Sequence, residues 1–278
     1  MSTPSSKQLL ERHRLAPKSS FGQNFLEDRN LVGRLAELCT PEGATVLELG
    51  AGLGALTRPL LERAARVIAV ERDRDLVPVL AAEFASELAA GKLVLREADA
   101  KGIDVGAELG DSPAPRVLCG NLPYNITGPL IEKAVHARGL LSRVVFLVQL
   151  EVADRLAASA GEEDYGALSV FVQAAYRVER ALVIRRGAFY PQPRVDSAVV
   201  VFTPHAEPLA EETPIFRALV RGAFQQRRKK LRNAWHNIPG RDQEAVALAA
   251  ERAGIDLDAR GETLSVQAFA RMSRELER

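Results

Sequence analysis

Residues 45–54 read TVLELGAGLG, and this stretch decides the fold class. It joins an apolar run, Thr45 to Gly50, to a turn with three glycines, and the residues that follow have a helical pattern. Glycines between a buried strand and a helix allow the backbone to approach a ligand, which the amide groups of the helix N-terminus then face. The stretch therefore predicts an α/β unit with a ligand at the carboxyl end of this strand.

Short apolar runs and longer helical patterns alternate after this turn. The runs are rich in Val, Leu and Ile without polar alternation, which is typical of parallel strands covered by helices on both faces. We expect strands over residues 66–71, 92–96, 116–119, 144–148, 178–184 and 197–202. A four-residue spacing of apolar side chains predicts a crossover helix at Leu76, Leu80, Phe84 and Leu88. The fold class is therefore α/β, with a Rossmann-like sheet.

A change of composition marks the expected domain boundary. Residues 203–214, TPHAEPLAEETP, contain three prolines and three glutamates, which is typical of a linker. Beyond them, helical patterns without strands cover residues 216–224, 243–253 and 265–276. The chain of 278 residues is long enough for two domains. We expect residues 1–206 to form the N-terminal segment plus the ligand-binding domain, and residues 207–278 to form a small all-helical domain.

Composition excludes several classes of protein. With 47% hydrophobic and 26% charged residues and a net charge of +1, the chain has an ordinary globular composition. No apolar stretch resembles a signal peptide or a membrane span, so we expect a cytoplasmic protein without a membrane partner. Its two cysteines, Cys39 and Cys119, and its four histidines are scattered, so we expect neither a disulfide scaffold nor a metal site.

An acidic residue accompanies the glycine turn. Glu71 ends the second predicted strand, where its carboxylate can accept hydrogen bonds from both hydroxyls of an adenosine ribose. Two ligands fit this arrangement, a dinucleotide or S-adenosylmethionine, because Gly50, Gly52 and Ala55 also satisfy the dinucleotide pattern. A tight turn that binds no ligand is the third interpretation.

The tetrapeptide Asn121-Leu122-Pro123-Tyr124 follows the fourth strand, where such a sheet presents ligand-binding loops. Its chemistry suits methylation of an exocyclic amine, whose lone pair is delocalised into the ring. The side-chain oxygen of Asn121 and the carbonyl of Leu122 can accept the amino hydrogens and so localise that lone pair. Tyr124 offers a face on which a flipped base can stack. The alternative is a structural turn with a capping Asn and a core Tyr.

These motifs and several others, in this order and spacing, resemble bacterial small-subunit (16S) ribosomal RNA adenine N6,N6-dimethyltransferases, the family whose loss confers kasugamycin resistance. The resemblance runs nearly end to end. Its further motifs are Gly22 to Leu26, Val148 to Ala153, Tyr165 to Ser169, Phe189 to Ser197 and Arg227 to Asn233. It implies an S-adenosylmethionine-dependent enzyme that dimethylates two adjacent adenines near the 3′ end of the rRNA, within the 30S particle, and acts as a monomer.

The resemblance also assigns residues. Cofactor-binding residues would be Gln23, Asn24, Leu26, Gly50, Gly52, Glu71, Asp99, Ala100 and Asn121, with Glu71 on the ribose and Asp99 on the adenine amino group. Catalytic residues would be Asn121, Leu122, Tyr124 and Phe189, the last two enclosing the flipped adenine. A core role before a strand is the alternative for Phe189.

A basic stretch lies near the C-terminus. Residues 221–232, RGAFQQRRKKLR, contain six basic residues and no acidic one. We expect these cations to contact RNA phosphates, namely Arg221, Arg227, Arg228, Lys229, Lys230 and Arg232. A solvated helix face is the alternative.

Three other functions compete with the small-subunit enzyme. The large-subunit rRNA adenine methyltransferases of macrolide resistance share the glycine turn and the Asn-x-Pro-Tyr loop, but the segments that begin at Gln149 and Tyr165 favour the small-subunit enzyme. A non-catalytic nucleic-acid-binding relative, such as the mitochondrial transcription factors, would not need Glu71, Asp99 and Asn121 intact. A nicotinamide-dependent dehydrogenase leaves the tetrapeptide unexplained.

Overall fold

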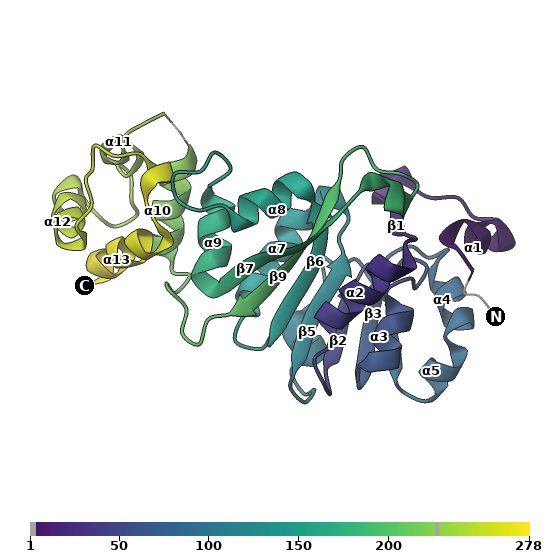
Figure 1. Cartoon of the computed structure of the whole chain (residues 1–278). Coiled ribbons are helices and arrows are strands. Elements are labelled where there is room, and N and C mark those ends of the chain that lie inside the picture. Colours follow the sequence, from purple (N-terminus) through teal and green to yellow (C-terminus); the bar gives the residue numbers. More distant parts are fainter. Residues whose placement is uncertain (1–3, 226–227) are drawn as a thin grey trace. The chain divides into compact units, whose positions relative to one another are not determined.

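A computed structural model describes residues 4–225 and 228–278. Its main sheet has seven strands in the order β4-β3-β2-β5-β6-β9-β7 (Figure 1). Neighbours from β4 to β6 pair in parallel, and β9 pairs antiparallel with β6. The strands are β2 Thr45–Leu49, β3 Arg66–Glu71, β4 Leu93–Glu97, β5 Arg116–Asn121, β6 Arg143–Gln149, β7 Tyr176–Ile184 and β9 Ser197–Pro204. The expected α/β class is confirmed.

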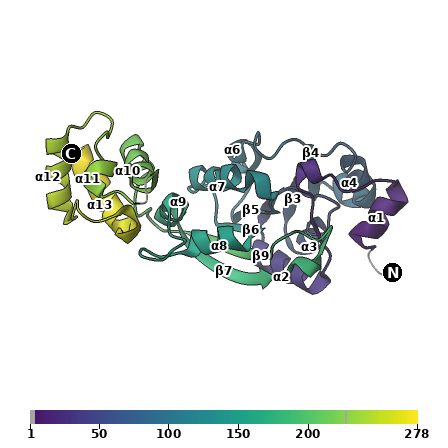
Figure 2. The same cartoon turned by 90° about the horizontal axis from the view of Figure 1, so that it is seen from above.

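Helices cover both faces of this sheet. Figure 2 shows α2 (Arg29–Cys39) and α3 (Thr57–Arg63) on one face and α6 (Val105–Leu109) and α7 (Thr127–His136) on the other. The crossover from β3 to β4 holds two helices, α4 (Val77–Glu83) and α5 (Ala85–Ala89), where the pattern predicted one. The chain kinks at the fully buried Phe84, whose ring contacts the Arg58 guanidinium. None of the described helices is long and apolar enough to cross a bilayer.

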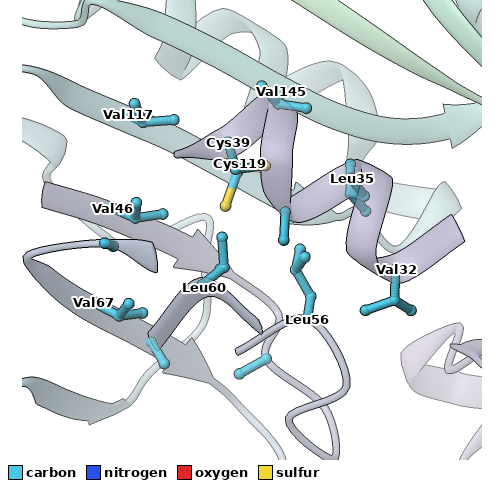
Figure 3. Close-up of a cluster of buried hydrophobic side chains, with 14 of the residues drawn as sticks. Val32, Leu35, Cys39, Val46, Leu56, Leu60, Val67, Val117, Cys119 and Val145 are labelled. Atoms are coloured by element: carbon cyan, nitrogen blue, oxygen red, sulfur yellow. The ribbon is translucent and has the colours of Figure 1, made fainter. Parts of the chain in front are cut away.

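The core between the sheet and α2 and α3 consists mainly of aliphatic side chains (Figure 3). Val46, Val67 and Val117 from three neighbouring strands face Leu35 of α2 and Leu60 of α3. Cys39 and Cys119 lie next to each other in this cluster, both fully buried and free. The two thiols are therefore neighbours in the fold, although the two cysteines lie far apart in the sequence.

The N-terminal segment runs along the sheet's carboxyl edge. It contains α1 (Ser6–His13), the 3-10 turn η1 (Ser19–Phe21) and the two-residue strand β1 (Phe25–Leu26). β1 pairs antiparallel with β8 (Phe189–Tyr190), which follows the 3-10 turn η3 (Arg186–Ala188). This small sheet joins segments far apart in the chain, and no local pattern predicted it.

The chain divides into two compact units, residues 1–153 with 179–203 and residues 154–178 with 204–278. The second unit contains α9 Ala167–Ala175, α10 Pro214–Gln225, α11 Leu231–Ala234, α12 Gln243–Ala253, the 3-10 turn η4 Gly261–Thr263 and α13 Val266–Glu277. This division differs from the expected boundary after residue 206, because residues 154–178 belong with the C-terminal helices. Val170 and Ala174 of α9 pack in one cluster with Phe216 of α10 and Phe269 of α13. The helix α8 (Leu150–Ala157) spans the first change of unit.

Candidate functional site

The glycine turn after β2 requires glycine at its ligand-facing positions. Gly50 and Gly52 have φ angles of +80° and +59°, a left-handed conformation that glycine adopts without strain. A Cβ atom on Gly52 would lie 3.1 Å from the ring of Phe25. The turn therefore keeps its shape, and its close contact with the N-terminal segment, because these residues have no side chain.

Glu71 ends β3 and ties the neighbouring loops together. One carboxylate oxygen accepts a hydrogen bond from the Gly52 amide at 2.8 Å, and the other accepts one from the Asp73 amide at 2.8 Å. Burial raises the pKa of Glu71, and these backbone hydrogen bonds oppose the shift. A carboxylate has about four acceptor sites. The acceptor capacity that the backbone leaves unused can receive a ribose hydroxyl.

Asn121, the last residue of β5, has a fixed amide orientation. Its side-chain Nδ2 donates a hydrogen bond to the backbone carbonyl of Asn24 at 2.8 Å. A carbonyl can only accept, so the amino group of Asn121 must face Asn24 and Oδ1 must face away from it. Within the described chain no donor bonds to Oδ1. This oxygen is therefore a hydrogen-bond acceptor that the described residues leave unused.

A small cavity brings most of the predicted site together. Its volume is about 50 Å³, and it is lined by Gly22, Gln23, Asn24, Phe25, Gly50, Gly52, Glu71, Asn121, Leu122 and Tyr124. Of the predicted residues, Leu26, Asp99, Ala100 and Phe189 do not line it. A space of this size holds water but no nucleoside. A nucleoside bound at these residues would therefore extend beyond this cavity.

Asp99 lies at the outer edge of the site, where it pairs with Arg72. The Arg72 guanidinium is 3.4 Å from the Asp99 carboxylate and stacks over the Phe21 ring at 4.4 Å. Ala100, next to Asp99, is buried. An adenine amino group can reach Asp99 only beside or in place of this guanidinium.

A network that the sequence analysis did not predict fastens the N-terminal segment. The buried Asp73 accepts hydrogen bonds from the Lys18 ammonium at 2.5 Å and the Gln23 amide at 2.8 Å. Burial alone would raise the pKa of Asp73, but these two bonds hold it below the usual range. The Gln23 oxygen accepts the Lys18 amide, so both ends of this side chain bond to the protein itself. The only sign of this network in the sequence is an acidic residue two positions after Glu71, and acidic residues are common in loops.

The two aromatic residues expected to enclose the base occupy different environments. Tyr124 is half-buried, lines the cavity, and its hydroxyl lies 2.8 Å from that of Ser197, the first residue of β9. Burial raises the pKa of Tyr124, and the bond to Ser197 opposes that rise. Phe189 is 5% exposed and packs in the core cluster. The structure therefore brings Tyr124 but not Phe189 to the cavity.

The basic stretch lies in the second unit and is only partly unpaired. Arg221, Arg228 and Lys229 are exposed, whereas Lys230 and Arg232 both pair with Asp258, at 3.2 and 2.8 Å. Arg227 lies outside the described residues.

The sheet differs from the one that usually binds a dinucleotide. The usual dinucleotide-binding sheet has six strands in the order 3-2-1-4-5-6. Here an antiparallel seventh strand, β9, lies between β6 and β7. Among the described residues, no three His, Cys, Asp or Glu side chains gather as a metal site.

A family model and two relatives agree on the kind of protein to which this chain is similar. A family model for ribosomal RNA adenine dimethylases matches residues 14–278. The ribosomal RNA small subunit methyltransferase A of Anaeromyxobacter sp. strain K is 43% identical over 98% of each chain. The protein of the same name from Geobacter sulfurreducens is 39% identical over 93% of this chain and 95% of its own.

Solved structures agree on the fold. A dimethyladenosine transferase from Plasmodium falciparum has a TM-score of 0.77 at 23% identity, over 89% of this chain and 95% of its own. The 23S rRNA methyltransferase ErmE has a TM-score of 0.68 at 26% identity, over 92% of this chain and 100% of its own.

Proposed function

The chain belongs to the ribosomal RNA adenine dimethylase family, and from this premise we propose that it transfers methyl groups from S-adenosylmethionine to N6 of two adjacent adenines near the 3′ end of small-subunit (16S) rRNA. The product is N6,N6-dimethyladenosine at both positions. The near-full-length relatives named for the small subunit support this choice of substrate. The observation that carries the chemistry is the oriented amide of Asn121, whose Oδ1 faces away from Asn24.

The residues of the carboxyl edge fit the cofactor. Glu71 would hold the ribose hydroxyls, Asp99 the adenine amino group, and Gly50 and Gly52 leave the room that a side chain would fill. S-adenosylmethionine, when bound, supplies an activated methyl group on sulfur.

The chain's own contribution is to prepare the amine. Oδ1 of Asn121 and the carbonyl of Leu122 accept the two N6 hydrogens, so the lone pair localises on nitrogen and can attack the methyl carbon in line. The proton that N6 then loses passes to solvent, and no strong base is required. Tyr124 provides the stacking face for the flipped base, and Phe189 would reach it only if its side chain left the core.

The main alternative is methylation of large-subunit rRNA, and the similarity to the 23S rRNA methyltransferase ErmE is the observation that favours it. Tritiated methyl transfer to unmethylated 30S and 50S subunits, with the modified nucleosides identified afterwards, separates the two. We expect dimethyladenosine in 30S subunits only. Label in 50S subunits, or none in either, would refute the proposed function.

The same assay tests Asn121. Asn121→Ala should lower the single-turnover rate by roughly a hundredfold or more, as loss of a preorganised transition-state hydrogen bond does elsewhere. Binding to 30S subunits should change little. We also propose that the protein acts as a monomer, and that it meets the 30S particle in the cytoplasm.

A further inference from the structure

The loop that precedes β9 carries positive charge to which the proposed function assigns no role. Residues 185–196 of the chain contain three arginines and a single acidic residue, Asp196. Arg186 and Arg194 of this loop are exposed. No carboxylate of the described residues lies within ion-pair distance of either. The loop is therefore a positive surface on which neither of these two guanidinium groups takes part in an ion pair.

Asp196 closes the loop and places its two ends side by side. One carboxylate oxygen accepts a hydrogen bond from the Arg186 amide at 2.9 Å, and the other pairs with Arg185 at 2.7 Å. These bonds hold the pKa of Asp196 below its usual range. Since Arg194 lies two residues before Asp196, the cations at positions 186 and 194 belong to one short stretch of surface.

Three contacts join this stretch to the candidate site. Ser197, next to Asp196, hydrogen-bonds to Tyr124, and β8, inside the loop, pairs with β1, whose Phe25 lines the cavity. The Ala188 carbonyl also accepts the Glu27 amide at 2.9 Å. The loop is thus anchored to the rim of the cavity on both sides of Phe189.

We propose that Arg186 and Arg194 bind the RNA phosphates that flank the flipped adenine, an inference that rests on the proposed function. A base taken out of its stack leaves its two phosphates at the mouth of the pocket. Guanidinium groups bind phosphate oxygens with charge-assisted hydrogen bonds. The loop adds an RNA surface to the N-terminal unit, separate from the basic stretch of residues 221–232.

The test compares two variants that lose the same charge. Arg186→Gln/Arg194→Gln removes the proposed contacts. Arg34→Gln/Arg66→Gln removes two exposed arginines of the same unit, in α2 and at the start of β3, that likewise have no ion-pair partner among the described residues. Binding to unmethylated 30S subunits is measured across a salt series. Each lost phosphate contact should flatten the slope of log affinity against log salt by about 0.7 to 0.9.

We expect the slope to fall by about 1.4 to 1.8 for the loop variant and to stay at the parent value for the control. Affinity for S-adenosylmethionine should be the same in all three proteins, which also shows that the variants are folded. Arg186→Lys/Arg194→Lys keeps both charges and should restore the slope.

The outcomes separate the inference from the function it rests on. A parent that methylates 30S subunits together with a loop variant that keeps the parent's slope would overturn the inference alone. A parent that neither binds nor methylates 30S subunits would overturn both.

Discussion

The hydroxyl of Ser197 fixes the ring of Tyr124 through one hydrogen bond of 2.8 Å. Ser197 is fully buried at the start of β9, so its position is set by the sheet. We expect Ser197→Ala and Tyr124→Phe each to cost about 1 kcal/mol in the transition state, a roughly fivefold lower kcat, because the stacking face loses its fixed angle. The measurement is steady-state methyl transfer to 30S subunits.

A double-mutant cycle provides the control for this prediction. Since both changes remove the same bond, the double variant should be no slower than either single one. Effects that multiply would show that Ser197 acts in another way. Ser197→Thr keeps the hydroxyl and should retain most of the parent's rate.

Glu48 makes stability depend on pH. It lies in β2, 1% exposed, and accepts a hydrogen bond from the Thr57 hydroxyl at 2.6 Å. Burial raises its pKa from 4.5 to about 7, Thr57 opposes the rise and the nearby Glu71 adds to it. Because the folded pKa is above the unfolded one, the carboxyl's stabilising contribution is complete below pH 4.5 and is lost as pH rises through 7.

We therefore expect the free energy of unfolding to fall by up to about 3 kcal/mol on this account between pH 4.5 and pH 8. Glu48→Gln keeps an acceptor for Thr57 and removes the titration. Urea unfolding at a series of pH values should show the variant gaining on the parent as pH rises. A constant difference between the two proteins would mean that Glu48 stays charged in the fold.

Among the helices and strands, the hydrophobic pattern predicted the bounds best where the packing of the element follows that pattern. The strand over 66–71 and the helix over 243–253 have the predicted bounds. The crossover helix breaks at Phe84, whose φ of −123° is not helical, although its ring is buried as the four-residue spacing predicts. The two-residue strands β1 and β8 exist only through each other, so neither has a local signal.

The pairing of β2 with β5 predicts a position that tolerates no side chain. A Cβ atom on Gly120 would lie 2.3 Å from the Leu49 carbonyl oxygen, so the two strands would have to separate. We expect Gly120→Ala to lower the free energy of unfolding by about 3 kcal/mol, the upper end of overpacking effects. Thermal or urea unfolding measures the change.

The matched control is Gly33→Ala in the middle of α2, where a Cβ atom meets nothing within 4 Å. Helix propensity alone should make that variant slightly more stable, by about 0.5 to 1 kcal/mol. Equal losses in both variants would show that the close approach to Leu49 is not what excludes alanine.

At the scale of the whole molecule, the candidate site depends on contacts between distant parts of the chain. Asn24 and Asn121 are 97 residues apart, and their hydrogen bond sets the direction of the Asn121 amide. The motifs predicted that both residues belong to the site, but residue types alone do not give this geometry. Asp73 and its bond to Lys18 escaped prediction for the same reason. The roles of the site residues themselves stay predictions that the experiments above address.

The net charge of +1 conceals two regions of positive surface, the loop before β9 and the basic stretch of residues 221–232. Arg228 and Lys229 have no carboxylate partner among the described residues, whereas Lys230 and Arg232 share Asp258. We expect Arg228→Gln/Lys229→Gln to flatten the salt dependence of 30S binding by about 1.4 to 1.8. Lys230→Gln/Arg232→Gln should flatten it less, because Asp258 already neutralises part of that charge.

Affinity for S-adenosylmethionine should be unchanged in both of these variants. If the slope were the same in the parent and in the Arg228/Lys229 variant, the stretch would be a solvated face and the RNA would bind elsewhere.

Cys39 and Cys119 lie side by side in the core of the N-terminal unit, so chemical labelling of their thiols reports when this unit opens. Burial raises the pKa of the Cys119 thiol, and alkylating reagents attack only thiolates that they can reach. A pulse of maleimide should therefore add mass to the chain only during excursions that expose this core, and the labelling rate gives their free energy. The same inertness allows a new surface cysteine near Tyr124 to carry a fluorophore selectively, with both native thiols left in place.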